Sequence, residues 1–294
     1  MGGLSSGRGG SREEKAKIIA ELRQRFPLTE LLRTVGLSRS TFYYHYRKPL
    51  EDKYQTEKAE ILKIFHDNKG RYGYRRVHEV LRQRGFGINH KTTQKLMHEL
   101  GLAGKMRRSK YRSYRGEVGK TAPNILNRNF KASKPFEKLV TDVTEFAVCD
   151  EKVYLSPVMD LYNREIVSYS ISRSANFTPT REMLIELFKK LPKDSKPLMH
   201  SDQGWQYQMR VYTDLLKEHG ITQSMSRKGN CLDNGAIENF FGRLKVEMFF
   251  GEHFESVKDF ERKLRDYIRY FNQDRISLKL GGLSPVQYRR RFAQ

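Results

Sequence analysis

The sequence predicts a chain with two kinds of part: an all-α N-terminal region, followed by an α/β core built on a mixed five-stranded sheet. In the first part, apolar residues recur at helical spacing and glycines separate the segments. From about residue 135 the pattern changes to short runs rich in Val, Ile, Tyr and Phe, which then alternate with helical stretches. A chain of 294 residues is long enough for two or three domains, one of them with a sizeable core.

The positive charge is concentrated in the first part. Of a net charge of +22, residues 1–134 carry +19 and residues 135–294 carry +3. A region this basic attracts a polyanion and releases the polyanion's counterions on binding, so nucleic acid is the expected partner. A ribosome-associated protein and an anionic membrane surface are the alternatives, although no basic amphipathic helix of the membrane-lying kind is present.

The sequence shows no segment for membrane insertion or export. It has no apolar run of about 18 residues, and residues 1–11, which are Gly/Ser-rich and expected to be disordered or tag-like, lack the apolar centre of a signal peptide. Cys149 and Cys231 stand far apart without a metal-binding spacing, which argues against a disulfide framework or a structural zinc site. We therefore expect a soluble, cytoplasmic protein.

Residues 12–50 are interpreted as a first helix-turn-helix. A helical pattern runs from Glu13 to Phe26 and ends at Pro27, and two short helices follow, separated by Gly36. Ser38 is placed to cap the last helix, which would present Arg39, Tyr44 and Arg47 to a DNA groove. The alternative is an ordinary helical hairpin.

Residues 51–104 repeat the arrangement. Helical patterns at 57–68 and 74–84 precede a third helix that Asn89 caps. Two such units in tandem within a basic region favour DNA, and the sheet aromatics of common RNA-binding modules are missing. The candidate contacts to phosphates and base edges are Arg75, His90, Lys91, Thr92 and Lys95.

Residues 105–134 are expected to be a basic linker. Its first part interleaves Lys and Arg, among them Arg107 and Arg108, with tyrosines. Charge combined with stacking suits an arm that follows DNA. A solvated tether explains the same composition, and both readings remain open.

The core, residues 135–275, is expected to start with three strands in series and to continue with alternating helices and strands, ahead of a C-terminal tail, residues 276–294. An antiparallel meander continued by parallel crossovers, with helices on both faces, is a ribonuclease-H-like α/β architecture. The predicted strands are 137–148, 152–160, 165–172, 196–201 and 221–226, and the predicted helices are 178–191, 207–218, 233–250 and 256–275.

Three acids of this core are candidate metal ligands and catalytic residues. Asp142 falls within the first predicted strand, Asp202 just past the fourth, and Glu238 on the helix after the fifth, with 35 residues between the last two. Ligands of open sheets gather at the carboxyl ends of strands. Hard ions such as Mg²⁺ prefer oxygen ligands, and two ions about 4 Å apart can assist phosphodiester displacement. With 34 acids in the chain the spacing alone is weak, so the context of each acid carries the hypothesis.

The helix predicted at 233–250 supports this hypothesis. Its apolar residues form one face, while Glu238, Gly242 and Lys245 share an adjacent polar face. Glycine is costly inside a helix, and here it leaves room for something to approach that face. The alternative is a solvated Glu and Lys on an amphipathic helix.

Several segments together resemble a known family: TDVTEF, HSDQGWQY, SMSRKGNCLDNGAIENFFGRLK and YIRYFNQDRISLKLGGLSPVQYR. They resemble the DDE transposases of bacterial insertion sequences, which have a retroviral-integrase-like core, and most closely the B-frame product of insertion-sequence family three. The resemblance covers residues 12–294. One departure is Val140, where the family pattern leads us to expect Trp.

The resemblance implies a function. It assigns Asp142, Asp202 and Glu238 to the catalytic triad, with Mg²⁺ or Mn²⁺, two ions per site, and Lys245 to a DNA contact. It implies hydrolysis of a strand at an element end to expose a 3′-OH, which attacks another phosphodiester, with circle formation before integration. The implied partners are double-stranded DNA (terminal inverted repeats and target), further copies of the chain on paired ends, and the upstream-frame product, in a nucleoid-associated setting.

Three alternatives to a transposase have less support in the sequence. A DNA-binding regulator with an inactive catalytic domain would be favoured by loss of one of the three acids, and none is lost. A metal-dependent nuclease for unselected DNA would not need two DNA-reading units. A tyrosine recombinase would need an Arg/His/Arg cluster ahead of a C-terminal tyrosine, and the sequence shows none.

Overall fold

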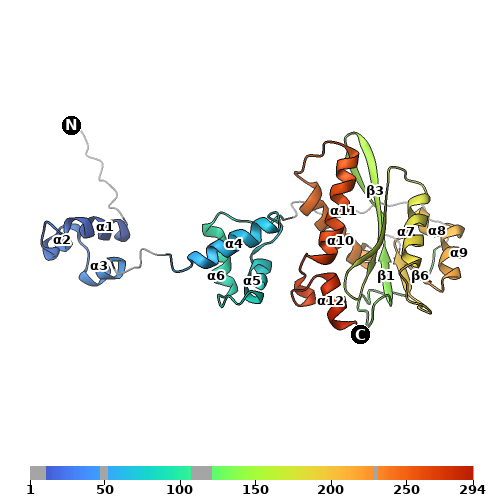
Figure 1. The fold of residues 1–294 in the computed structure, drawn as a ribbon, viewed down its shortest axis with the longest axis horizontal. Coiled ribbons are helices and arrows are strands. Elements are labelled where there is room, and N and C mark those ends of the chain that lie inside the picture. Colours follow the sequence, from blue (N-terminus) through green and yellow to red (C-terminus); the bar gives the residue numbers. More distant parts are fainter. Residues whose placement is uncertain (1–10, 47–51, 107–120, 228–230, 294) are drawn as a thin grey trace. The chain divides into compact units, whose positions relative to one another are not determined.

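The computed structural model describes residues 11–46, 52–106, 121–227 and 231–293 (Figure 1). The chain forms two compact units, Met1–Ala59 and Glu60–Gln294. No helix in the described ranges is long and apolar enough to cross a membrane.

The first unit is built on three short helices around a small apolar core. Gly36 ends the second helix with a left-handed φ of 64°, and the Ser38 hydroxyl accepts the backbone N–H of Thr41 at the start of the third, as the sequence predicts. The first helix is shorter than the predicted 13–26. The helices are α1 (Arg12–Leu22), α2 (Leu28–Val35) and α3 (Arg39–Tyr46), and the buried core residues are Ala16, Ile19, Leu32, Leu37 and Phe42.

The next three helices have the predicted order. The Asn89 side chain accepts the backbone N–H of Thr92 at 3.0 Å, so it caps the third helix as expected. Apolar residues of all three helices are buried, including Ile64, Val77 and Leu96. The helices are α4 (Gln55–Asp67), α5 (Tyr74–Gln83) and α6 (His90–Glu99).

The sheet of the core has six strands rather than the predicted five. The predicted first strand, 137–148, is broken at Asp142 and Val143, so the prediction that Asp142 lies within a strand is wrong. Both halves pair antiparallel with β3. They lie along the same edge of β3, because β4 pairs with the other edge over residues 154–159, which overlap both contacts. The strands are β1 (Lys138–Thr141), β2 (Thr144–Val148), β3 (Glu151–Asp160), β4 (Ile166–Ser172), β5 (Leu198–Ser201) and β6 (Thr222–Met225).

The broken strand lies at the point where the sheet changes from antiparallel to parallel. The order is β2-β3-β1-β5-β6 with β4 beside β3, and β1, β5 and β6 run parallel. Because β1 and β2 share one edge of β3, the sheet keeps five strand positions. A mixed sheet of this order, preceded by a helical region, is the predicted ribonuclease-H-like fold.

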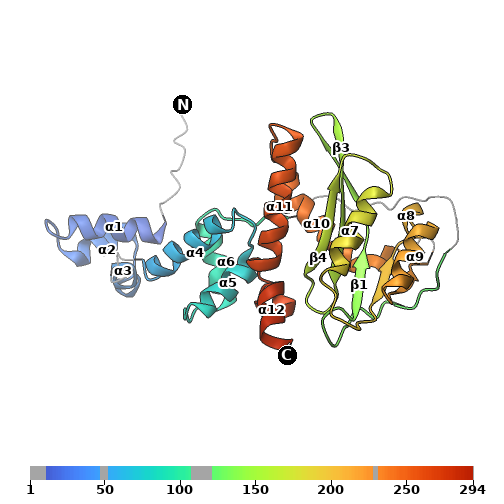
Figure 2. The ribbon, with the colours of Figure 1, turned by 45° about the vertical axis from the view of Figure 1, so that its right-hand side comes forward.

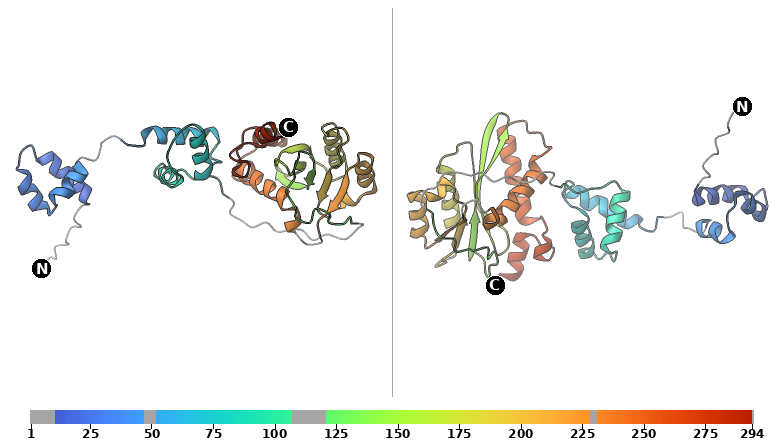
Figure 3. Two further views of the ribbon diagram at one scale, coloured as in Figure 1. Left: turned by 90° about the horizontal axis from the view of Figure 1, so that it is seen from below. Right: turned by 180° about the vertical axis from the view of Figure 1, so that it is seen from behind.

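Helices cover both faces of the sheet (Figures 1 and 3). Successive strand residues point to opposite faces, so Leu139 packs under α7 (Thr178–Phe188) and α9 (Arg210–Glu218), while Val140 packs under α10 (Gly235–Leu244) and α11 (Val257–Gln273). Figure 2 shows α12 (Pro285–Phe292) below α11, the two following one another on the same side of the sheet. Burial on both faces fixes the register of the strands that carry the candidate acids.

Three predicted elements differ in detail. The helix predicted at 207–218 is two helices, α8 (Trp205–Gln208) and α9, which meet at Met209 in an extended conformation. The helix predicted at 233–250 is a 3₁₀ turn (Cys231–Asn234), then α10, then a π-helix, η2 (Lys245–Phe249). The C-terminal tail contains η3 (Leu278–Leu280) and α12 (Pro285–Phe292), which a Ser284/Gln287 capping box starts.

Candidate functional site

Asp142 and Asp202 are brought together by the parallel pairing of β1 and β5. Val140 is paired with His200 in this ladder, and each acid stands two residues further along its strand direction, just past the end of the strand. Carboxyl ends of adjacent parallel strands open on the same edge of the sheet. The break in the first strand therefore places Asp142 beside Asp202 instead of burying it in the ladder.

Glu238 is brought to the same place by the start of α10. The Asn234 side chain donates to the backbone carbonyl of Thr141 at 3.3 Å, which ties the residue before α10 to the residue before Asp142. Glu238 stands in the first turn of α10, one helical turn beyond Asn234. The charge of Glu238 acts on Asp142, so the start of α10 brings Glu238 within electrostatic range of that aspartate.

The pKa values report that these carboxylates interact. Burial raises the pKa of Asp142 well above its usual value, and the charges of Asp202 and Glu238 raise it further. The backbone N–H of Val143 and the charge of Lys245 oppose this rise. Burial also raises the pKa of Asp202, against the donation from the N–H of Gly204. Like charges held together in a partly desolvated place are what a bound cation relieves.

The donor set suits a hard divalent ion. Asp142 Oδ1 accepts from Val143 at 2.7 Å and Asp202 Oδ1 accepts from Gly204 at 2.9 Å, which orients each carboxylate and leaves its second oxygen without a hydrogen bond among the described residues. Oxygen ligands of this kind are what Mg²⁺ and Mn²⁺ prefer. Within the described part of the chain, however, no three His, Cys, Asp or Glu side chains stand close enough to hold one ion.

Lys245 and Gly242 extend this site along α10. Lys245 begins the π-helix; its Nζ lies 5.3 Å from the centroid of the Phe146 ring, and its charge reaches Asp142. Gly242 lines a pocket whose lining includes neither Glu238 nor Lys245, so the predicted room on their face stays a prediction.

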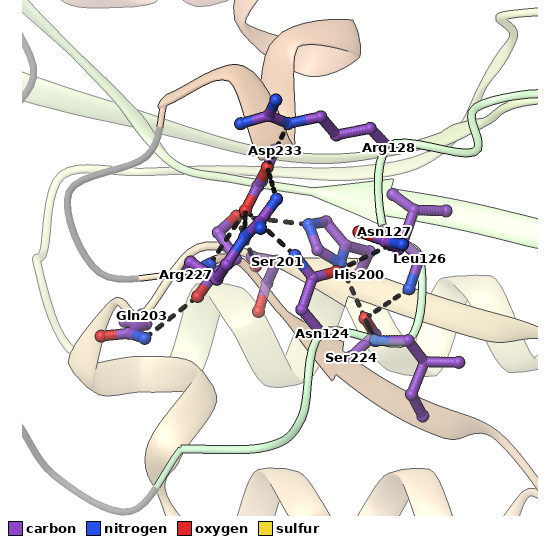
Figure 4. A network of polar contacts seen from close by, with 12 residues as sticks. Asn124, Leu126, Asn127, Arg128, His200, Ser201, Gln203, Ser224, Arg227 and Asp233 are labelled. Carbon is purple, nitrogen blue, oxygen red and sulfur yellow. Dashed lines mark hydrogen bonds and ion pairs between the residues drawn. The ribbon is translucent and has the colours of Figure 1, made fainter.

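A buried polar network beside the acids was not foreseen (Figure 4). Its centre is Asp233, whose carboxylate accepts from Arg227, Arg128 and Asn124 at 2.7–3.2 Å. Hydrogen bonds from Arg227, then those from Arg128, hold the pKa of Asp233 far below its usual value. The network joins Asn124 and Arg128, in the last part of the predicted linker, to the turn that starts α10. It thereby holds the start of the helix that carries Glu238.

His200 completes the network on β5. Its Nδ1 and Nε2 lie 2.9 Å and 3.2 Å from the hydroxyls of Ser224 and Ser226 on and after β6. Burial lowers the pKa of His200 to about 4, so the ring is neutral at neutral pH and acts as a hydrogen-bonding link. In the sequence, His200 stands two residues before Asp202 and Asp233 stands five residues before Glu238. This closeness to the predicted acids is the pattern from which the network could have been suspected.

The predicted DNA contacts lie on the helical units. Arg39 and Tyr44 are exposed on α3, and Tyr44 is 72% exposed. Thr92 is half-buried, and Lys95 pairs with Glu99 at 3.8 Å. Arg47, Arg107 and Arg108 lie outside the described residues. The remaining predicted contacts are exposed on α5 and α6: Arg75, His90 and Lys91.

We predict that Asp233→Asn lowers the free energy of unfolding at pH 7 by about 2 kcal/mol, because it removes charge-assisted hydrogen bonds from two arginines. A carboxylate whose pKa is depressed in the folded state contributes its full stability above the unfolded pKa, about 4, and loses that contribution as pH falls below it. The difference between variant and wild type should therefore shrink below about pH 4. Denaturant unfolding across this range checks it.

The matched control is Asp214→Asn, which breaks an exposed pair with Arg210 on α9 and should change stability by less than about 0.5 kcal/mol. Equal effects of the two substitutions at pH 7 would show that the Asp233 network does not hold the start of α10.

Comparison with known proteins agrees with the geometry. Residues 132–231 and 238–292 match two integrase core domain families, and residues 51–110 match an HTH-like domain. The chain is 55% identical over 276 residues to the putative transposase InsK for insertion sequence element IS150 of Escherichia coli K12, covering 93% of this chain and 97% of the relative.

A more distant sequence relative agrees with this result, and one solved structure shows a lower similarity. Transposase InsF for insertion sequence IS3A of the same organism is 31% identical over 281 residues, 93% of this chain and 98% of the relative. The HTLV-2 integrase catalytic core domain in complex with magnesium is 16% identical, covering 53% of this chain and 97% of that chain with a TM-score of 0.39. On the strength of its sequence relatives, the chain belongs to the integrase-core transposases of bacterial insertion sequences, the family of the IS150 and IS3 proteins.

Proposed function

We propose that this transposase cuts and joins DNA strands with a DDE active site formed by Asp142, Asp202 and Glu238. The observation that supports the proposal is that Asp142 and Asp202 stand just past the ends of two parallel strands, where the charges of Asp202 and Glu238 raise the pKa of Asp142. Carboxylates from distant parts of the sequence that act on one another in a desolvated place are typical of a functional site.

The reaction proposed has two displacements at phosphorus. Water attacks the phosphodiester at an element end, the P–O3′ bond breaks, and a 3′-OH and a 5′-phosphate are left. The oxygen of that 3′-OH then attacks a second phosphodiester, forms a new P–O bond and releases another 3′-OH. Joining of the two ends gives a circle, and attack on target DNA gives integration.

The residues of the site have separate tasks in this scheme. Asp142 and Asp202 would hold Mg²⁺ or Mn²⁺, two ions per site, with Glu238 completing the set. Such ions activate the attacking oxygen and neutralise charge on the leaving oxygen. The N–H groups of Val143 and Gly204 keep the two aspartates oriented, and the network around Asp233 holds the turn that leads to Glu238. Lys245 is placed to meet a phosphate next to the acids.

DNA is delivered by the basic first half of the chain. Residues 1–134 hold +19 of the net charge, and the HTH-like domain lies within them. Terminal inverted repeats would be read by exposed residues of α3 and α6, and target DNA would enter at the acids. Because two ends must be joined, a homo-oligomer on paired ends is the proposed assembly, acting on chromosomal DNA in the bacterial cytoplasm.

Replacing any one of the three acids with its amide should abolish strand cutting and joining while leaving DNA binding intact. We predict that Asp142→Asn, Asp202→Asn and Glu238→Gln each bind element-end duplex about as tightly as wild type but lose strand cutting and joining by at least about 10²-fold. Gel-shift and strand-cleavage assays on the same labelled duplex measure both. Glu218→Gln, an exposed acid at the end of α9, is the control and should keep both. Joining retained by any of the three variants would remove that acid from the mechanism.

Binding of the ion should be visible without turnover. We predict that Mg²⁺ raises the unfolding free energy of wild type by about 2.7 kcal/mol at 100 times its dissociation constant, and much less in Asp142→Asn or Asp202→Asn. Thermal unfolding with a Mg²⁺ titration measures this. An unchanged Mg²⁺ effect in both variants would place the ion elsewhere.

A further inference from the structure

A strongly basic hollow lies between α5, α10 and α11 in the unit Glu60–Gln294. It consists of two pockets of about 220 Å³ each, which share Asn239, Arg243 and Arg275 in their walls. Its only acidic lining residue is Glu247. The basic lining residues are Arg76, Lys105, Arg164, Arg243, Arg275 and Lys279.

Glu247 offsets these charges only in part: its charge raises the pKa values of Arg76 and Arg243, but its carboxylate oxygens are bonded to other residues. Arg275 donates to both of its oxygens, at 2.5 Å and 2.8 Å, and the Tyr267 hydroxyl donates at 2.9 Å. Lys105 is paired with Glu252 at 2.8 Å. Arg76, Arg164 and Arg243 make no ion pair with any residue in the described ranges.

Arg76 has an unused donor in this hollow. Its Nε is buried and has no hydrogen-bond acceptor, and its guanidinium contacts only the ring of Tyr72 among the aromatic residues described, at 5.6 Å. A buried donor without an acceptor is costly, and an arginine presents its donors as a planar fork. An acceptor oxygen of a ligand in the hollow would satisfy this donor.

The charges in the hollow also repel one another. Burial lowers the pKa of Arg76, and the charge of Arg275 lowers it further. Arg243 is exposed, but the neighbouring protein removes part of its hydration, and this lowers its pKa. The charge of Arg275 lowers the pKa of Arg243 further. The arginines of the hollow thus repel one another as the carboxylates of the site do, with the opposite sign of charge. A bound anion with several acceptor oxygens would relieve this repulsion. A phosphate suits two arginine forks.

The position of the hollow indicates which phosphate of a bound DNA strand it would hold. Gly242 lies close to the face of α10 that carries Glu238 and also lines the hollow, whereas Arg243, five residues beyond Glu238, stands about 140° around the helix from it. At 1.5 Å per residue, Arg243 stands about 7 Å along the helix axis from Glu238, which is about the rise of two nucleotides of one strand. Arg76 comes from α5, in the HTH-like domain, so a phosphate held here would touch both that domain and the catalytic core.

We propose that Arg76 and Arg243 bind a backbone phosphate of the DNA about two nucleotides from the phosphodiester that is cut, and so position the strand against Glu238. This rests on the proposed function, since it assumes that the strand passes the three acids. Arg76 and Arg243 are positioning residues in this scheme and take no part in the bond changes.

The test replaces single phosphates in an element-end duplex with neutral methylphosphonates, one position at a time around the cut. Wild type should bind about tenfold more weakly when one phosphate about two nucleotides from the cut is neutral. The double variant Arg76→Gln, Arg243→Gln should bind unmodified duplex about tenfold more weakly, with a salt slope lower by about 1, and should no longer respond to that substitution. Arg181→Gln, an exposed arginine of α7 on the other face of the sheet, is the control and should retain the response.

The outcomes separate the proposals. If wild type does not bind the duplex, the proposed function fails. If wild type binds and the double variant keeps the full methylphosphonate response, the pocket proposal is overturned. A free-anion site would also overturn it: inorganic phosphate would then raise the melting temperature of wild type but not of the variant, while DNA binding stayed equal. Arg243→Gln alone, at the open side of the hollow, repeats the test should the double variant not fold.

Discussion

The repulsion among Asp142, Asp202 and Glu238 is the constraint on which the rest of the core depends. Burial and mutual charge both raise the pKa of Asp142, so the three acids would separate if the scaffold allowed it. The scaffold resists in two ways. Parallel pairing of β1 with β5 sets the two aspartates side by side, and the Asn234 and Asp233 contacts hold the start of α10 against them.

The same unit holds the HTH-like helices against the core through polar contacts. Arg71 donates to the backbone carbonyl of Glu247 at 3.3 Å and stacks over Tyr270, whose hydroxyl donates to Asn68 at 3.2 Å. The N–H of Ile276 donates to the Tyr72 hydroxyl at 2.9 Å. The segment that precedes the catalytic core thus meets the π-helix after α10, α11 and the chain after it.

Much of this could be predicted from the sequence because it depends on local pattern. The Gly36 turn, the Asn89 cap and the order of core elements follow from spacing and from turn chemistry, and Asp202 lies just past its strand as predicted. The break at Asp142 could not be predicted, because residues 137–148 are rich in β-branched and aromatic residues and contain no glycine or proline that would mark an interruption. The ladder with β3 shows that two short strands share one edge there.

The polar network and the basic hollow depend on contacts between distant segments, which no local pattern encodes. Asp233 meets Arg128 across 105 positions, and Arg71 meets Glu247 across 176. In the sequence Arg243 is one of 56 basic residues. Only the packing of α5 against α10 and α11 shows that Arg76 and Arg243 line the same pocket, where the acid beside them, Glu247, is bonded to Arg275.

The most direct measurement of the central claim supplies an element-end duplex that already carries its 3′-OH, together with Mg²⁺ and an unlabelled target duplex. The account predicts a labelled product longer than the donor strand, in which the 3′ end has been joined to target DNA. It would be contradicted by stable binding without any joined product, which would indicate a regulator, or by cutting of the target without joining, which would indicate a nuclease.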